Sequence, residues 1–178
     1  MHVTDVPPLP ARARTTVSQV IRTNVAAPPG TDALRRMTLA AAVLVVVQVA
    51  VGMVVNLYVT VPAHHPGAHP ANYFSGSFHS VAWAIGSGAI SLAVHGALGL
   101  AVILFALTVA TRAVILRTGR VVAVSAVLAA LLVIGAGFNG ASFLDFGGQN
   151  ISSLIMALLA LGALCCYLLA AYMLPPRV

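Results

Sequence analysis

Histidine is the side chain in this sequence best suited to chemistry, because neutral imidazole can bind haem iron, copper or zinc. His95 lies well inside a long apolar run, where an ionisable group is costly and usually functional. Gly96 and Gly99 beside it would leave room for a flat macrocycle. We therefore take haem b bound through His95 as the first hypothesis.

Amides and small residues accompany His95 on two other apolar runs. Gln48, Gly52 and Asn56 are spaced at i, i+4 and i+8, so they share one helix face. Counted along the helices, Asn56, Asn139 and His95 fall in the same outer half of a bilayer. We expect Gln48, Gly52, Asn56 and Asn139 to line a cofactor site around His95, with the three amide side chains as its polar shell. The alternative is that these side chains only hydrogen-bond between helices.

A six-coordinate haem needs a second axial ligand, and none of the other apolar runs contains a histidine. The candidates are His79, another loop histidine, Met53, or a second copy of the chain in a homodimer. Otherwise His95 is the only ligand.

Four further histidines are close together in one proline-rich segment and are predicted ligands of copper or zinc: His64, His65, His69 and His79. Pro66-Gly67 interrupts the regular i, i+4 pairing of a helical metal site. The alternative is a loop that contacts lipid headgroups.

Acidic residues are too few for carboxylate chemistry. The chain has no Glu, and its acids are Asp5, Asp32 and Asp145. Carboxylate-bridged metal pairs and aspartic dyads need acids within the bundle. The sequence therefore favours a protein that is not an enzyme and indicates no catalytic residue.

The element pattern is that of an all-α integral membrane protein. Each of four apolar runs is long enough for a hydrocarbon core of about 30 Å. They cover residues 37–61, 86–111, 120–143 and 150–174. Short turns after the second and third runs predict a four-helix antiparallel bundle, within a membrane domain of residues 35–175. A short interfacial helix is expected near 75–85, in the loop between the first two spans.

The charge pattern sets the expected orientation. All basic side chains other than histidine are arginines, and they precede the first span, separate the second from the third, or follow the fourth. This alternation predicts both termini in the cytoplasm and the loop 62–85 outside, in the plasma (inner) membrane of a prokaryote. The arginines therefore serve topology and contact with anionic lipid, not nucleic acid. Residues 1–34 are rich in Pro and Arg and are expected to be a disordered cytoplasmic tail.

Three short runs resemble one four-helix half of the haem A synthase family. They are Gln48-Val49-Ala50-Val51-Gly52-Met53-Val54-Val55-Asn56, His95-Gly96-Ala97-Leu98-Gly99 and Gly135-Ala136-Gly137-Phe138-Asn139-Gly140-Ala141. The resemblance implies that His95 is an axial haem ligand, with Gln48 and Gly52 packed against the porphyrin. The chain lacks the outer-loop cysteine pair of that family, so the resemblance favours haem binding over haem oxidation.

Two classes of function follow. The first is a haem- or metal-binding membrane protein associated with respiratory chemistry, with a respiratory complex as a candidate partner. The second is a non-catalytic accessory or scaffold subunit whose polar residues only pack helices. A Soret band that depends on His95 would separate the two.

Overall fold

The computed structural model describes residues 30–174, and within this range it is all helical. Its helices are α2 (Thr31–Tyr58), α3 (Tyr73–Ser87), α4 (Ile90–Ile115), α5 (Arg120–Asp145) and α6 (Asn150–Met173). Four of them, all except α3, are long and apolar enough to cross a membrane. The prediction of an all-α protein with four helices long and apolar enough to span a membrane is therefore confirmed.

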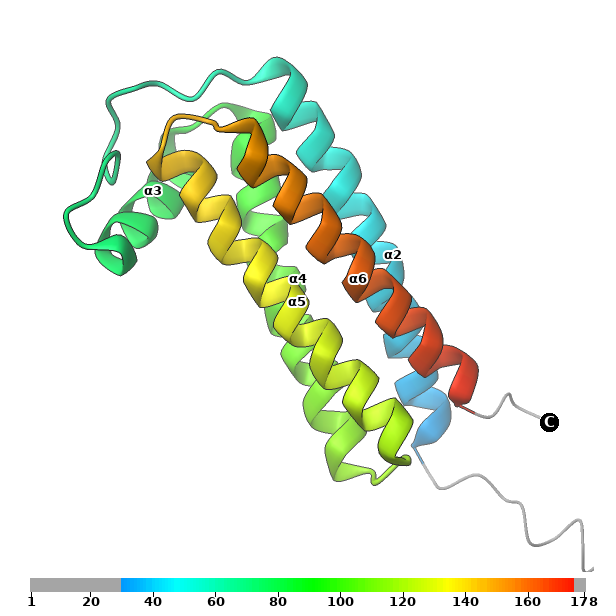
Figure 1. Cartoon of the computed structure of the whole chain (residues 1–178). Helices are drawn as coiled ribbons and strands as arrows, with labels where there is room; N and C mark the ends of the chain where they lie inside the picture. The colour runs from blue at the N-terminus through cyan, green and yellow to red at the C-terminus, as the bar shows by residue number, and fades with distance from the viewer. Residues whose placement is uncertain (1–29, 175–178) are drawn as a thin grey trace, which may run out of the picture.

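The four long helices form a bundle in which chain neighbours run in opposite directions (Figure 1). α2 packs on α4 and α6, and α5 packs on the same two helices, which closes the ring. We call one end of the bundle the arginine end; its described arginines are Arg35, Arg36, Arg112, Arg117 and Arg120. We call the opposite end, where α3 lies, the α3 end.

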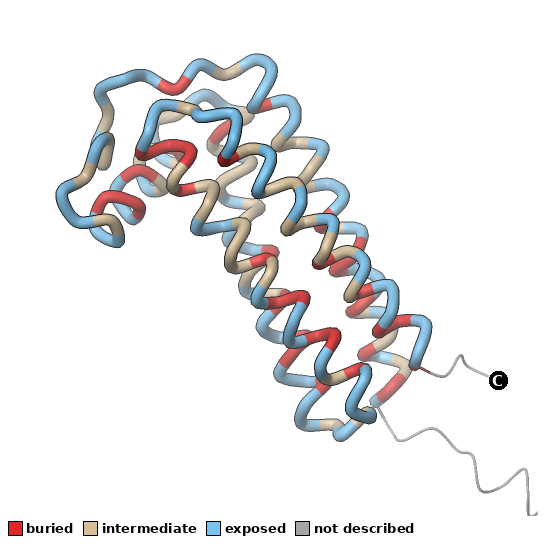
Figure 2. Tube along the Cα trace, viewed as in Figure 1, coloured by how far each residue is buried: buried red, intermediate tan, exposed pale blue. Residues whose placement is uncertain are grey.

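Buried residues, coloured red in Figure 2, form two groups. The larger core fills the half of the bundle toward the arginine end and surrounds the fully buried Tyr167. Small residues such as Ala106, Ala129 and Ala163 let the helices approach closely there. The smaller core lies at the α3 end and includes Leu92 and Leu144. The cavity described below lies between these two cores.

α3 lies across the end of the bundle, against α4 and α5 (Figure 1). Its first turn is capped by Asn72, whose side-chain oxygen accepts a hydrogen bond from the Ser75 amide at 3.1 Å. The helix expected near 75–85 is therefore present and longer than predicted. It ends because Gly88 is extended, with φ −74° and ψ 173°, and packs so closely on Ala84 that a Cβ would clash.

The span boundaries differ from those read along the sequence. The first span begins at Thr31 rather than 37, inside the segment expected to be a tail. The second begins at Ile90 rather than 86, because Gly86 and Ser87 belong to α3. The rest of the predicted tail, residues 1–29, lies outside the described residues.

Candidate functional site

Between the two cores lies a cavity of about 590 Å³ that is partly open to the surface, and α2 to α6 all contribute to its lining. Ligand pockets in proteins are typically about 300–1,000 Å³, so this one suits a molecule of cofactor size. Small residues shape its wall: Gly52, Ala84, Gly96, Gly99, Ala136, Gly137, Gly140, Ala141, Ala157 and Ala160. Among the described residues that line it, none is Asp, Glu, Lys or Arg. The cavity is therefore large, uncharged and mainly apolar.

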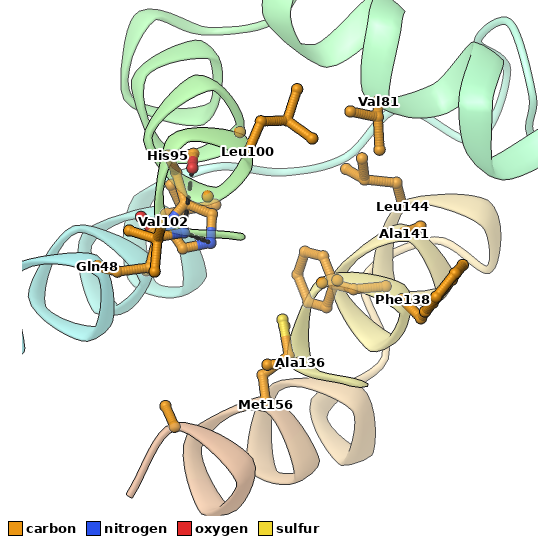
Figure 3. Close-up of a pocket in the computed structure, with 18 of the residues that line it drawn as sticks. Gln48, Val81, His95, Leu100, Val102, Ala136, Phe138, Ala141, Leu144 and Met156 are labelled. Carbon is orange, nitrogen blue, oxygen red and sulfur yellow. Dashed lines mark hydrogen bonds between the residues drawn. The ribbon is translucent and has the colours of Figure 1, made fainter. Parts of the chain in front are cut away.

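The main polar pair on the wall is formed by Gln48 of α2 and His95 of α4 (Figure 3). The Gln48 amide donates to the His95 backbone oxygen at 3.1 Å and lies 3.4 Å from His95 Nε2. Two glycines make this approach possible. A Cβ on Gly52 would lie 2.9 Å from His95 Cε1, and one on Gly99 would lie 3.0 Å from Gln48 Nε2. The structure thus brings together three residues predicted for one cofactor site: Gln48, Gly52 and His95.

Two atoms of this pair are buried without a hydrogen-bond partner among the described residues, His95 Nδ1 and Gln48 Oε1. When the Gln48 amide donates to Nε2, a neutral imidazole carries its proton on Nδ1. That N–H is then an unsatisfied donor between α2 and α4. Buried groups of this kind usually have a structural or functional reason.

The cavity meets some of the requirements of a haem site but not all of them. The volume and the glycine-rich wall suit a macrocycle, and Met53 and Met156 add two thioethers to the lining. The two ring nitrogens of His95 do not suit it as placed, because Nε2 lies 3.4 Å from the Gln48 amide nitrogen and Nδ1 is buried. No basic side chain lines the cavity to receive a propionate. The cavity therefore has room for a haem, but its side chains are not placed to coordinate the iron or to pair with a propionate.

The two asparagines predicted for the site, Asn56 and Asn139, lie apart from each other. Asn56 is exposed and lines the cavity, with no bond to His95. Asn139 donates to the backbone oxygen of Ser152 and so joins α5 to α6. The predicted convergence of both on His95 is not what the structure shows, because α5 is rotated so that Asn139 faces α6.

His65 makes the most contacts of the predicted loop ligands. Its Nδ1 lies 3.0 Å from the oxygen of Pro66, and its Nε2 lies 3.2 Å from the oxygen of Leu144. Its ring stacks on Trp83, with centroids 4.4 Å apart and planes at 15°. Both nitrogens thus face carbonyl oxygens instead of a metal position.

The other loop histidines point elsewhere. His79 Nδ1 lies 2.7 Å from the oxygen of Ser75, and His69 meets the edge of Phe146. Within residues 30–174, no group of three or more His, Cys, Asp or Glu side chains could hold a metal ion. The arrangement gives no support to copper or zinc binding by His64, His65, His69 and His79.

Polar contacts between α3 and α5 were not anticipated from the sequence. The Tyr73 hydroxyl donates to the oxygen of Phe138 at 3.0 Å and lies 2.8 Å from Ser142 Oγ. One turn later, Ser77 Oγ donates to Oδ2 of the fully buried Asp145 at 2.8 Å. The i, i+4 spacing of Tyr73 and Ser77 is the signal that could have indicated this face. Because α3 also lines the cavity, these bonds hold a cover over it.

Met156 was also missed. It lines the cavity from α6, opposite the face that carries the predicted ligands (Figure 3). A Cβ on Gly140 would lie 3.2 Å from its sulfur, so that glycine makes room for the thioether. A single Met in an apolar run gives no sequence signal of such a role.

No family model matches the sequence, and no curated protein or solved structure matches it either. The resemblance to haem A synthase therefore stays a prediction. What the fold and the site establish is an all-α structure with four helices long and apolar enough to cross a membrane, and a cavity beneath α3 with no charged side chain in its lining.

Proposed function

We propose that this protein binds a neutral, mainly apolar molecule taken from the lipid bilayer, held in the cavity beneath α3. The observation that carries the proposal is the cavity itself, about 590 Å³ within a chain of 178 residues. Small-molecule sites are typically concave, mainly apolar clefts of about 300–1,000 Å³ with a few polar groups. This cavity has that size and that lining, so we infer an occupant.

The lining indicates the class of occupant. It carries no charged side chain, and its polar groups are few. A charged ligand would lose its hydration without gaining a partner, which is costly in a low-dielectric site. An acyl or isoprenoid chain meets no such penalty. We place the α3 end on the outer side of a prokaryotic plasma membrane, because the arginine end is the one expected in the cytoplasm.

The test is to purify the protein in mild detergent, extract it with organic solvent and quantify bound apolar molecules. Ala136→Leu and Ala157→Leu place bulk inside the cavity, and both positions line it. Ala101→Leu is the matched control, since Ala101 is on α4, exposed and outside the lining. We expect the wild type and the control to retain the molecule and the filled variants to lose it. Equal retention by all four proteins, or none in the wild type, would refute the proposal.

Haem b bound through His95 is the second candidate, and one observation favours it. The glycine-rich wall around His95 leaves space for a macrocycle. The imidazole would have to turn away from Gln48, and Met156 or a second copy of the chain would supply any second ligand. The test is an absorption spectrum of protein made with added haem. A Soret band that His95→Ala abolishes and His79→Ala preserves supports haem, and colourless protein excludes it.

A scaffold role is the remaining outcome of these experiments. Its support is that Gln48, Tyr73 and Asn139 each bond to a neighbouring helix. If no apolar molecule and no haem copurifies with the protein, these residues only fix helix packing.

A further inference from the structure

The cavity is partly open to the surface, and its exposed lining residues indicate where the opening lies. Among the described residues of the lining, the exposed ones fall into two sets, a larger set from three helices and a smaller set from α2 alone. The larger set is Phe74 and Phe78 of α3, Leu100 of α4, and Gly137 and Phe138 of α5, and the smaller set is Met53 and Asn56.

The larger set surrounds one opening between α4 and α5. Leu100 and Phe138 reach the cavity from these two helices (Figure 3). On one edge, α3 packs on both helices, and the ring of Phe74 meets that of Phe138 edge to face, with centroids 6.1 Å apart. On the other edge the helices close again, because a Cβ on Gly137 would lie 2.8 Å from Cδ1 of Ile103. The opening is therefore bounded by α3 at one end and by this close contact at the other.

The depth of the larger set favours contact with acyl chains. At a rise of about 1.5 Å per residue, Phe138 lies about 10 Å from the end of α5 and Leu100 about 15 Å from the start of α4. Both positions fall within a hydrocarbon core of about 30 Å centred on these helices. Asn56 lies only about 3 Å from the end of α2, at headgroup level. Its amide is a polar group that is costly to bring into hydrocarbon.

The side chains of α3 at the opening are suited to the same environment. Phe74 and Phe78 are 70% and 74% exposed, and their i, i+4 spacing puts them on one face of the helix. Exposed apolar patches of this kind mark sites of contact with a membrane or a protein. The larger set contains no polar side chain, so an apolar molecule that passes through it loses no hydration and meets no unpaired polar group.

We propose that this opening is a lateral entrance, through which the bound apolar molecule exchanges with the acyl chains of the bilayer, and that Leu100 and Phe138 limit its width. This inference rests on the proposed function, because it concerns how the occupant of the cavity arrives. It adds the route, which runs between α4 and α5 beneath α3, and it assigns the exposed aromatic residues of α3 to contact with lipid.

The test follows a neutral long-chain alcohol that carries an alkyl diazirine, added to phosphatidylcholine vesicles that contain the full-length protein. Irradiation after increasing times, followed by mass spectrometry of the peptides, gives the labelling of Met156, which lies across the cavity from Leu100 (Figure 3). The rate of labelling measures entry, and the final level measures occupancy. Ala136→Leu, which fills the cavity, shows how much label reaches Met156 directly from the lipid.

Leu100→Ala and Phe138→Ala widen the entrance and should each raise the rate several-fold. Leu107→Ala is the matched control, because Leu107 lies two turns along α4, outside the lining, and is 43% exposed against 47% for Leu100. It should label at the rate of the wild type. The two entrance variants lie on different helices, so either one suffices if the other does not fold.

Equal rates in Leu100→Ala, Phe138→Ala and Leu107→Ala would overturn the entrance. Faster labelling in Met53→Ala than in Leu100→Ala would also overturn it, because the route would then pass α2. These results leave the proposed function intact, since the final level of labelling is unchanged. If Met156 is labelled no more in the wild type than in Ala136→Leu, while lipid-facing peptides are labelled, the proposed function is refuted and the entrance with it.

Discussion

Replacing Gly52 by alanine probes the meeting point of α2 and α4. The added Cβ would lie 2.9 Å from His95 Cε1, whereas non-bonded carbons prefer about 3.5–4.0 Å. The imidazole would have to move by roughly 0.6 Å or more. The hydrogen bond from the Gln48 amide to the His95 backbone oxygen restricts this movement. Overpacking costs about 1–3 kcal/mol, and the better helix propensity of alanine offsets about 1 kcal/mol. We expect the free energy of unfolding to fall by roughly 0–2 kcal/mol.

The assay is a double-mutant cycle with His95→Ala, read as the free energy of unfolding in detergent from Trp83 fluorescence. Without the imidazole the clash is absent, so Gly52→Ala should stabilise the His95→Ala protein by up to about 1 kcal/mol. Gly86→Ala is the control, because a Cβ there meets nothing within 4 Å; its effect should be the same in both backgrounds. If Gly52→Ala changes the free energy of unfolding equally in the wild-type and His95→Ala proteins, the packing of His95 on Gly52 is refuted.

Three further predictions concern the contacts that close the bundle. Tyr73→Phe should lower the free energy of unfolding by about 0.5–1.5 kcal/mol, while Tyr58→Phe, at a residue 81% exposed, should leave it unchanged. A thermal melt compares the two. Asn139→Ala removes the bond between α5 and α6 and should cost about 0.6–1.7 kcal/mol in the same measurement; an unaltered melt would contradict that bond. Asp145→Ala leaves the Ser77 hydroxyl without its acceptor and should cost about 1–3 kcal/mol, whereas Asp145→Asn keeps an acceptor oxygen and should cost less. Equal losses would argue against the Ser77 contact.

The spans were predictable because their signal is length and apolar composition, which the chain shows without interruption. The start of the second span was not, since the apolar run continues from α3 into α4 across Ser87 and Gly88. The break is visible in the backbone at Gly88, which is extended, with φ −74° and ψ 173°. Hydropathy counts apolar residues and does not register a change of helix direction within a run.

The site was predictable where residues share one helix face. Gln48 and Gly52 are one turn apart on α2, and both meet His95. The rotation of each helix about its axis depends on packing against neighbours, and the sequence does not state it. For that reason Asn139 was expected at His95 and is instead bonded to α6, and Met156 was not expected at the cavity.

The loop between α2 and α3 shows a different limit of prediction from sequence. Its histidines suggested a metal site from residue type alone, but their positions depend on the path of the backbone. Gly67, at φ +95°, packs directly against Gly76 and Ser80 of α3. This close approach brings His65 to Trp83 and Leu144. Composition indicated which side chains were available, and the contact between loop and helix decided their partners.

The most direct test of the central claim is native mass spectrometry of the wild-type protein released from detergent. The cavity of about 590 Å³ predicts a complex with one non-covalently bound apolar molecule, which is absent from Ala136→Leu and present in Ala101→Leu. A wild-type spectrum that contains only the mass of the polypeptide, under conditions that preserve the fold, would contradict the account.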